Sequence, residues 1–324
     1  VQNNTHTESD GDIRGTGFEI RGGSSLDMSD WDQEHEPNTI SGNGRTAFRA
    51  DGGILNLRGG SIWENDILIS KTNKLIISGH QRGITAGRKS TVTLQRVEIK
   101  DNTETGIDLY DGSNLNIWFD RTNEEESDGV LISGNGIATD SNNHRAGLRI
   151  NNGSTANVDF VKIIENGRGI EVRDNSILKG GWSASESNAL TYGIIIKDNK
   201  REGLRIQNNS TVHADYVQVE NNAVDEVTDD GNTWRDEAIE VRDSSVLDMD
   251  RSRIANNKDS ILRVSGKSYA HFYDIEIDAN AGNTAIRVDS SELEISGANL
   301  DDDDADVYPN PVVISGHEYG IRAS

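Results

Sequence analysis

The chain repeats one frame of strands and turns, which is clearest in Gly203–Asn222. If Gly203 is offset zero, apolar residues fall at offsets 1 and 3, 9 and 11, and 14 and 16. Each pair shows the period-two alternation of a short β-strand, and polar turns separate the pairs. One copy of the frame therefore predicts three short strands.

The frame recurs along nearly the whole sequence, and its offsets 1 and 3 are apolar in every copy. The copies begin at Gly17, Ala47, Gly83, Gly106, Gly147, Gly169, Gly203, Ala238, Ile261, Ala285 and Gly320. A repeat of this length built of strands alone predicts a solenoid. Its successive coils would pair through parallel strands about 4.8 Å apart, so that ten complete coils make a rod of roughly 50 Å.

The composition suits such a solenoid. Hydrophobic residues make up only 33% of the chain and aromatic residues 5%, which is enough for a core one side chain deep. Glycine is abundant (33) and proline scarce (3), as expected where strands keep their N–H groups for pairing between coils. We expect one all-β domain over residues 13–324, preceded by a polar leader over residues 1–12.

The charge balance narrows the range of partners. Asp and Glu number 55 against 32 Lys and Arg, so the net charge is −23. This charge argues against nucleic acid and anionic membranes, and it favours cations, basic surfaces or neutral glycans. No apolar run approaches the roughly 18 residues of a membrane span. The chain has no cysteine, which fits an extracellular protein held by its strand pairing.

Two polar positions of the frame are as regular as the apolar ones. Offset 19 holds Asn43, Asn102, Asn135, Asn166, Asn199, Asn222, Asn257 and Asn280, with His80 and His317 in two other copies. Offset 7 holds Ser24, Ser90, Ser113, Ser154, Ser176, Ser210, Ser245 and Ser268. Stacked Asn and Ser side chains hydrogen-bond along a turn, and Asn tolerates the left-handed backbone of a sharp corner. We expect two structural ladders, in which the histidines replace asparagine.

Five copies of the frame carry insertions at the corner between the second and third strands, so one edge of the rod should carry the loops. Tryptophans lie in or beside four of these insertions: Trp31, Trp63, Trp118 and Trp182. Each indole could pin its loop to the solenoid wall, since it buries a large area with one polar end. The alternative is that the four indoles form platforms on which the sugar rings of a glycan stack.

Acidic residues cluster in the same insertions. One cluster comprises Glu124, Glu125, Glu126 and Asp128, and another comprises Asp301, Asp302, Asp303, Asp304 and Asp306. Clustered carboxylates suit calcium, which takes six to eight oxygen ligands, although no known calcium-loop motif is present. The alternative is a solvated run of charge. No cofactor is required by the sequence, and calcium is the one ion that it suggests.

The outward face of the first strand is charged at offset 2, where signs alternate through Asp108, Arg149, Glu171, Arg205, Glu240 and Arg263. Opposite charges one strand apart can pair and set the register, although an exposed pair contributes only about 0–1 kcal/mol. In a second hypothesis, Glu171 and Glu240 flank Arg205 as paired catalytic carboxylates. Two coils would separate them by about 9.6 Å, near the roughly 6.5–9.5 Å of inverting glycosidases.

The frame resembles the right-handed parallel β-helix superfamily, as in GIEVRDNS (Gly169–Ser176) and VEIKDN (Val97–Asn102). That superfamily includes pectate-lyase-like enzymes, phage tailspikes and adhesin-like surface proteins. The catalytic motifs of polygalacturonases do not carry over, because Gly79-His80 is followed by Gln81 rather than by glycine, and R-I-K is absent. The resemblance is nearest to adhesin-like noncatalytic surface solenoids.

These patterns favour a noncatalytic extracellular or cell-surface β-helix that assembles end to end into a fibre or surface layer. Val1 and Gln2 of the leader, and Gly320, Ile321 and Ser324 of the last coil, are the candidate subunit contacts. The alternative is a polysaccharide-binding or polysaccharide-degrading protein, such as a tailspike on a virion or a pectate-lyase-like enzyme. A carbohydrate-binding module without turnover is a third hypothesis.

Overall fold

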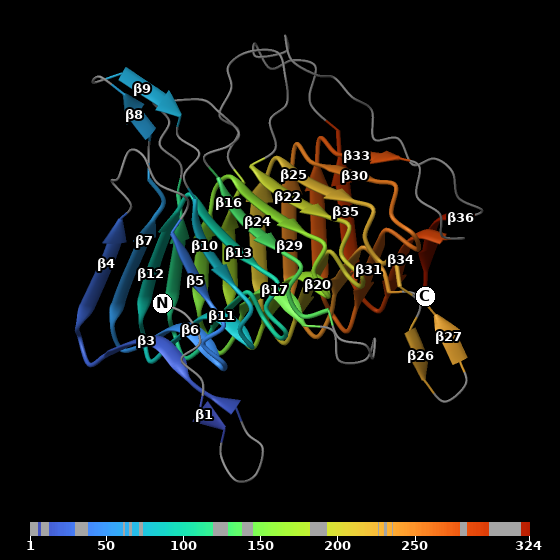
Figure 1. The fold of residues 1–324 in the computed structure, drawn as a ribbon. Helices are drawn as coiled ribbons and strands as arrows, with labels where there is room; N and C mark the ends of the chain where they lie inside the picture. Colours follow the sequence, from blue (N-terminus) through green and yellow to red (C-terminus); the bar gives the residue numbers. More distant parts are fainter. Residues whose placement is uncertain are drawn as a thin grey trace.

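The computed structural model describes the greater part of the chain. The described residues are 6–7, 13–29, 38–60, 62–64, 67–70, 74–118, 129–137, 145–181, 193–225, 227–229, 232–234, 236–278, 284–297 and 319–324. Within them the secondary structure is strand and turn, with no helix. Three long parallel sheets wrap around a common axis as a right-handed parallel β-helix (Figure 1).

The first-strand sheet has eleven strands, one from each predicted copy of the frame. In spatial order they are β3 (Thr16–Arg21), β6 (Thr46–Asp51), β11 (Arg82–Gly87), β14 (Ile107–Leu109), β17 (Ala146–Ile150), β20 (Arg168–Arg173), β23 (Leu204–Gln207), β28 (Ile239–Val241), β31 (Leu262–Ser265), β34 (Thr284–Asp289) and β36 (Tyr319–Ala323). The predicted starts of all eleven copies are therefore confirmed.

The second-strand sheet has ten strands and the third-strand sheet has nine. The second comprises β4 (Ser25–Ser29), β7 (Ile54–Arg58), β12 (Thr91–Gln95), β15 (Asn114–Ile117), β18 (Thr155–Val158), β21 (Ile177–Gly180), β24 (Thr211–Asp215), β29 (Val246–Asp250), β32 (Tyr269–Tyr273) and β35 (Glu292–Ser296). The third comprises β5 (Thr39–Ser41), β10 (Leu75–Ser78), β13 (Val97–Lys100), β16 (Val130–Ser133), β19 (Val161–Ile164), β22 (Ile194–Lys197), β25 (Val217–Glu220), β30 (Arg253–Ala255) and β33 (Glu276–Asp278).

Three short antiparallel hairpins lie outside these sheets. They pair β1 (His6–Thr7) with β2 (Ile13–Arg14), β8 (Ile62–Glu64) with β9 (Ile67–Ser70), and β26 (Val227–Asp229) with β27 (Asn232–Trp234). The first of them spans the predicted boundary between residues 12 and 13. In Figure 1, β8–β9 projects from the upper edge of the β-helix and β26–β27 from the lower edge.

The chain leaves the β-helix where the insertions were predicted. It departs after β4, β7, β15, β21 and β35, which are all strands of the second-strand sheet, and the first four of these departures are followed by a return to the third-strand sheet. All five insertions therefore begin at the same corner of the coil, as predicted.

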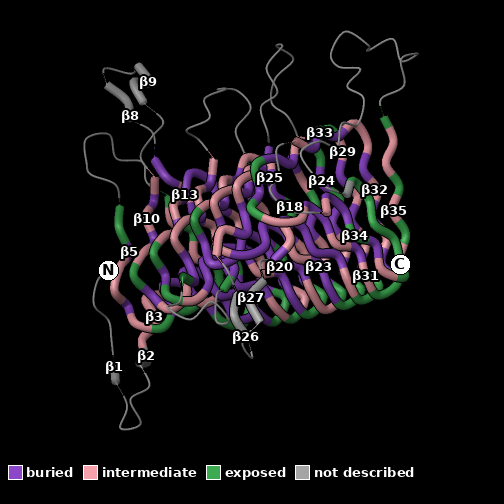
Figure 2. Tube along the Cα trace, turned by 90° about the vertical axis from the view of Figure 1, so that its right-hand side faces the viewer, coloured by how far each residue is buried: buried purple, intermediate pink, exposed green. Residues whose placement is uncertain are grey.

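The core is a single apolar column between the three sheets, lined by inward residues of the strands (Figure 2). At the ends of the column the apolar residues of β4 and β35 are only partly buried, and Ile321 of β36 is exposed. Matching offsets stack from coil to coil, so that Ile170, Leu204 and Ile239 are partners in neighbouring strands. All three are almost fully buried. Because a shift of one residue would turn these side chains to solvent, the alternating pattern fixes the register of each sheet.

The asparagine ladder is confirmed at the corner between the third and first strands. The backbone N–H of each ladder residue donates to the side chain of the ladder residue in the next coil, for example from Asn135 to Asn166 at 2.9 Å and from Asn166 to Asn199 at 2.9 Å. The ladder runs through Asn43, His80, Asn102, Asn135, Asn166, Asn199, Asn222 and Asn257. Asn280, the last predicted member, lies outside the described residues.

His80 replaces asparagine in the ladder, as the sequence predicted. Its Nδ1 accepts a hydrogen bond from the N–H of Asn43 at 3.1 Å, and its Nε2 lies 3.1 Å from the carbonyl oxygen of Ile40. The second contact requires the proton on Nε2, since a carbonyl only accepts. Burial lowers the pKa of this imidazole, which keeps it neutral in that tautomer. His317 lies outside the described residues.

The left-handed corner residue is not the ladder asparagine, and that part of the prediction is wrong. The residue just before it has the positive φ, as in Asp101 (54°), Glu165 (57°) and Asp198 (56°). The asparagine instead uses its side chain inside the corner: Nδ2 of Asn166 donates to the carbonyls of Ile132 and Ile164. Asparagine is therefore required here for hydrogen bonding rather than for backbone conformation.

The serine ladder follows the corner between the first and second strands. The N–H of each serine donates to Oγ of the next, from Ser90 to Ser113 at 3.1 Å and so on through Ser154, Ser176, Ser210, Ser245 and Ser268 to Ser291. Oγ of Ser90 also donates to the carbonyl of Gly87 at 2.6 Å, so the hydroxyl closes its own turn. Two corners of the coil are thus fixed by side chains.

Asn166→Ala should lower the free energy of unfolding by roughly 2–4 kcal/mol, because each buried polar group left without a partner costs about 1–3 kcal/mol. The substitution removes the acceptor of the Asn135 N–H and two donors to buried carbonyls. Chemical denaturation measures the loss. Asn157→Ala is the matched control: its exposed side chain makes one bond, to Asn116, and the change should stay within about 0.5 kcal/mol. Equal losses in the two variants would contradict a structural ladder.

Candidate functional site

Most of the residues that the sequence suggested for binding lie outside the described part of the chain. These are Trp31, Trp182, both acidic clusters (Glu124, Glu125, Glu126, Asp128, and Asp301–Asp304 with Asp306), Val1 and Gln2. Trp63 falls in β8, of which only the backbone is described. The glycan-platform and calcium hypotheses for these residues therefore stay predictions.

Trp118 is described, and it directly follows β15, at the corner that bears the insertions. Its side chain is 45% exposed, which places it among the few large apolar groups open to solvent on the described surface. On the same face, the exposed Asn157 donates through Nδ2 to Asn116 Oδ1 at 3.1 Å. An exposed indole offers a flat apolar surface to a ligand.

The alternating charges of the first-strand sheet form ion pairs across neighbouring strands, as predicted. Arg149 contacts Asp108 at 2.5 Å, and Nε of Arg205 lies 3.0 Å from Glu240 Oε2. The second pair is an ion pair without a hydrogen bond, because the Nε–H does not point at the carboxylate. These strands are in register, with Arg205 between Glu171 and Glu240.

This row is more buried than the sequence suggested. Asp108, Glu171 and Glu240 are each less than a tenth exposed. The first residue of β20 and the turns before β23 and β28 add further charges at the border of the sheet, so that Arg168 pairs with Glu202 at 2.7 Å and Arg201 pairs with Asp236. Removing one partner from a buried pair leaves an uncompensated charge and is far more costly than at an exposed pair.

Two glutamates at this border have opposite electrostatic surroundings. Burial would raise the pKa of Glu202, but the guanidinium groups of Arg168, Arg205 and Arg201 overcome this and lower it to about 2. Burial raises the pKa of Glu237 to about 7, and the nearby carboxylate of Glu240 adds to the shift. Glu202 is therefore ionised at neutral pH and Glu237 is about half protonated. Carboxyl groups with such different pKa values occur in acid–base sites, and structural networks also produce them.

The contacts of Glu171 and Glu240 do not support the hypothesis that these two residues are catalytic carboxylates. Arg205 lies between them in the sheet and is paired with Glu240, so this carboxylate is committed to a neighbouring guanidinium. Burial raises the pKa of Glu240, and Arg205 opposes that effect. The structure thus places the two glutamates within a row of compensated charge.

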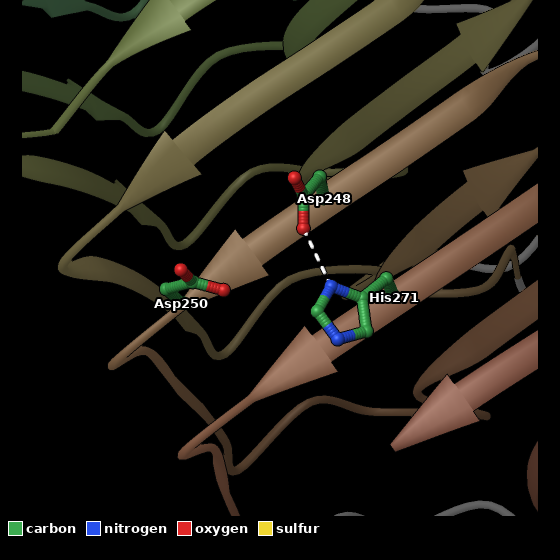
Figure 3. Close-up of side chains that lie close together, drawn as sticks. All are labelled: Asp248, Asp250 and His271. Carbon is green, nitrogen blue, oxygen red and sulfur yellow. Dashed lines mark hydrogen bonds and ion pairs between the residues drawn. The ribbon is translucent and has the colours of Figure 1, made fainter. Parts of the chain in front are cut away.

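A second group of polar residues lies on the outward face of the second-strand sheet. Asp248 and Asp250 are two residues apart on β29, and His271 on β32 is the strand partner of Asp248. Nδ1 of His271 lies 2.8 Å from Asp248 Oδ1 (Figure 3). Nδ1 of His213 on β24 lies 3.3 Å from Asp248 Oδ2. One ligand atom of each of Asp248, Asp250 and His271 lies within 4.8 Å of the others.

Carboxylates crowd this part of the sheet. Asp215 on β24 is the strand partner of Asp250, directly beside the pair of Asp248 and His213. Burial raises the pKa of Asp215 and of Asp250, and the charge of Asp248 raises both further. In the first-strand sheet opposite charges alternate, whereas here three carboxylates adjoin one another, with His213, His271 and the guanidinium of Arg251 as the nearby bases.

Sequence reasoning missed both the border charges and this cluster. The frame itself contained the signal for the cluster: His213, Asp248 and His271 all occupy offset 10, and Asp215 and Asp250 occupy offset 12. Aligning the outward positions of the second strand, as was done for the first, would have predicted their proximity. The border charges carry a similar signal, because Arg168 and Glu202 each stand one residue before the start of their copies, and Arg201 and Asp236 each stand two residues before.

Comparisons with models of protein families, with curated proteins and with solved structures found no significant match to this chain. The parallel β-helix is therefore established by the strand topology alone. In the described residues there is no helix of the length and apolarity needed to cross a membrane.

Glu237→Gln should make stability less dependent on pH. The pKa of Glu237 in the folded protein, about 7, lies above the ordinary value of 4.5, so its favourable contribution is complete below about pH 4.5 and is lost as pH rises through 7. At pH 8 the variant should be more stable than the wild type by roughly 1–3 kcal/mol, and at pH 4.5 the two should differ little.

Urea denaturation at both pH values measures this difference, with the exposed Glu292→Gln as the control. A constant difference between Glu237→Gln and the wild type at the two pH values would show that folding does not raise the pKa of Glu237.

Proposed function

We propose that this chain is a noncatalytic extracellular β-helix that builds or decorates a surface, and that its copies stack end to end. The proposal rests on the regular polar ladders, on the compensated charges of the first-strand sheet, and on the open strand edges and partly exposed apolar side chains of the two end coils. It also follows the resemblance of the frame to adhesin-like surface solenoids.

The two end coils of the described β-helix have open strand edges and incompletely covered apolar side chains. β3 and β36 lie at opposite ends of the first-strand sheet, and each pairs with one described strand only (Figure 1). Ile321 in β36 is 53% exposed, and Phe18, Leu26 and Met28 at the other end are partly buried. The unpaired N–H and C=O groups of such an open coil can hydrogen-bond to another coil that has the same frame.

The two ends match in pattern as well as in geometry. Since Gly17 and Gly320 occupy the same offset, β36 of one copy placed beside β3 of the next would bring Ile321 against Phe18. The same register places Arg322 against Glu19, which continues the alternation of charge seen inside the sheet. This complementarity of apolar and charged positions is the observation that carries the end-to-end proposal.

Electron microscopy with mass measurement in solution tests it. The wild type should form fibres with a repeat close to the length of one subunit, and both Arg322→Glu and Glu19→Arg should disassemble them by placing like charges at the junction. An equal mixture of the two variants should reassemble, because every junction in an alternating fibre again pairs opposite charges.

Lys179→Glu is the control, since Lys179 is an exposed residue in the middle of the rod and its reversal should leave the fibres intact. Stable wild-type monomers at high concentration, with and without calcium, would contradict stacking. So would two variants that stay apart when mixed but remain folded.

A second candidate function is polysaccharide binding, with or without cleavage, and the exposed Trp118 favours it. Trp118→Ala should weaken binding to a recognised glycan about tenfold or more, as is typical for an aromatic anchor. Ile137→Ala removes a side chain of nearly equal exposure (46%) and should not. Release of reducing ends would indicate a hydrolase and unsaturated products a lyase, whereas binding without products would indicate a binding module.

A further inference from the structure

The outward face of the second-strand sheet brings nitrogen and oxygen donors to one point. Asp248 and Asp250 face the same side of β29, and His271 lies beside Asp248 on the next strand. Figure 3 shows the three side chains grouped on this face, with the imidazole bonded to Asp248. We propose that Asp248, Asp250 and His271 together bind one divalent transition-metal ion.

The spacing suits an ion after small movements. The three ligand atoms lie within 4.8 Å of one another, and zinc bonds of about 2.0–2.2 Å require neighbouring ligands roughly 3.4 Å apart. The side chains of Asp248 and His271 are 40% and 26% exposed, so rotation about their own bonds can close this gap without moving the strands. His271 would bind through Nδ1, the atom that now faces Asp248.

One oxygen of the group lacks a partner. Oδ1 of Asp250 is shielded from solvent, yet it accepts no hydrogen bond within the described structure. A shielded carboxylate oxygen without a donor costs free energy, which a cation would recover. The charge of the nearby Arg251 acts on Asp250 and lowers its pKa, but the guanidinium donates to the Tyr216 hydroxyl at 2.9 Å and makes no hydrogen bond to Oδ1.

The donor set selects the class of ion. Calcium and magnesium prefer shells made of oxygen alone, whereas an imidazole with two carboxylates suits zinc, manganese or cobalt. The site therefore differs in chemistry from the acidic insertions, for which calcium is the hypothesis. It also differs in place, since it lies on the flat of the sheet rather than in a loop.

The bound ion would connect two neighbouring coils of one chain, because its ligands come from β29 and β32. His213, which contacts the other oxygen of Asp248, is positioned to hold that carboxylate. Three protein ligands leave a coordination position of a tetrahedral ion open toward solvent, for water or for an acidic group of an external ligand. The proposal is independent of stacking, since a single copy supplies every ligand.

Calorimetric titration of the metal-free chain with zinc alone tests the proposal. The wild type should bind one equivalent at a site that His271→Ala and Asp250→Asn each weaken at least about tenfold. Asp27→Asn is the matched control, because Asp27 is an exposed outward carboxylate of β4 in the same sheet. It should bind zinc as the wild type does.

The melting temperature in the presence of zinc is an independent test of the same proposal. The ion should raise the melting temperature of the wild type and of Asp27→Asn, and it should raise that of the two site variants less. Calcium titration should be insensitive to His271→Ala. Equal zinc affinity in the wild type and in folded His271→Ala and Asp250→Asn would overturn the proposal, and so would the absence of a stoichiometric site in the wild type.

Discussion

The hydrogen bond from one ladder residue to the next is the interaction on which the rest of the molecule depends. A corner between two strands leaves backbone groups that no sheet can pair, and in a solenoid these groups would be buried in every coil. The side chain of Asn166 accepts from the N–H of Asn135 and donates to two carbonyls around the corner. Because each such side chain spans two coils, it fixes both the corner and the register of the neighbouring strands.

The fold was predictable because the core constrains every coil in the same way. Offsets 1 and 3 must be apolar, and offset 19 must hydrogen-bond, so the frame is visible even where insertions interrupt it. The left-handed corner position was missed although residue type indicates it in most coils: it holds glycine, aspartate or asparagine, as in Gly79, Asp101 and Asn221, and Glu165 is the exception. At Glu165 the structure around the residue imposes the backbone that its side chain alone would disfavour.

The outward residues were harder to predict, because no core selects them. The role of an outward residue depends on which residues lie beside it in the sheet. For Asp248 and His271, applying the frame to the second strand predicts that the two are neighbours. The pKa of Glu237 has no counterpart in the sequence, because it depends on how deeply the turn is buried. The two faces also differ in their charge pattern: opposite charges alternate along the first-strand sheet, whereas carboxylates adjoin one another on the second-strand sheet.

Hydrogen exchange of single backbone amides tests most directly whether the ladder holds the coils together. If it does, the amides of Asn135, Asn166 and Asn199 should be among the slowest to exchange, since their acceptors are buried side chains of the next coil. Protection should fall toward β3 and β36, where the strands have a free edge. Rapid exchange at these three amides, in a protein whose core strands remain protected, would contradict the role given to the ladder.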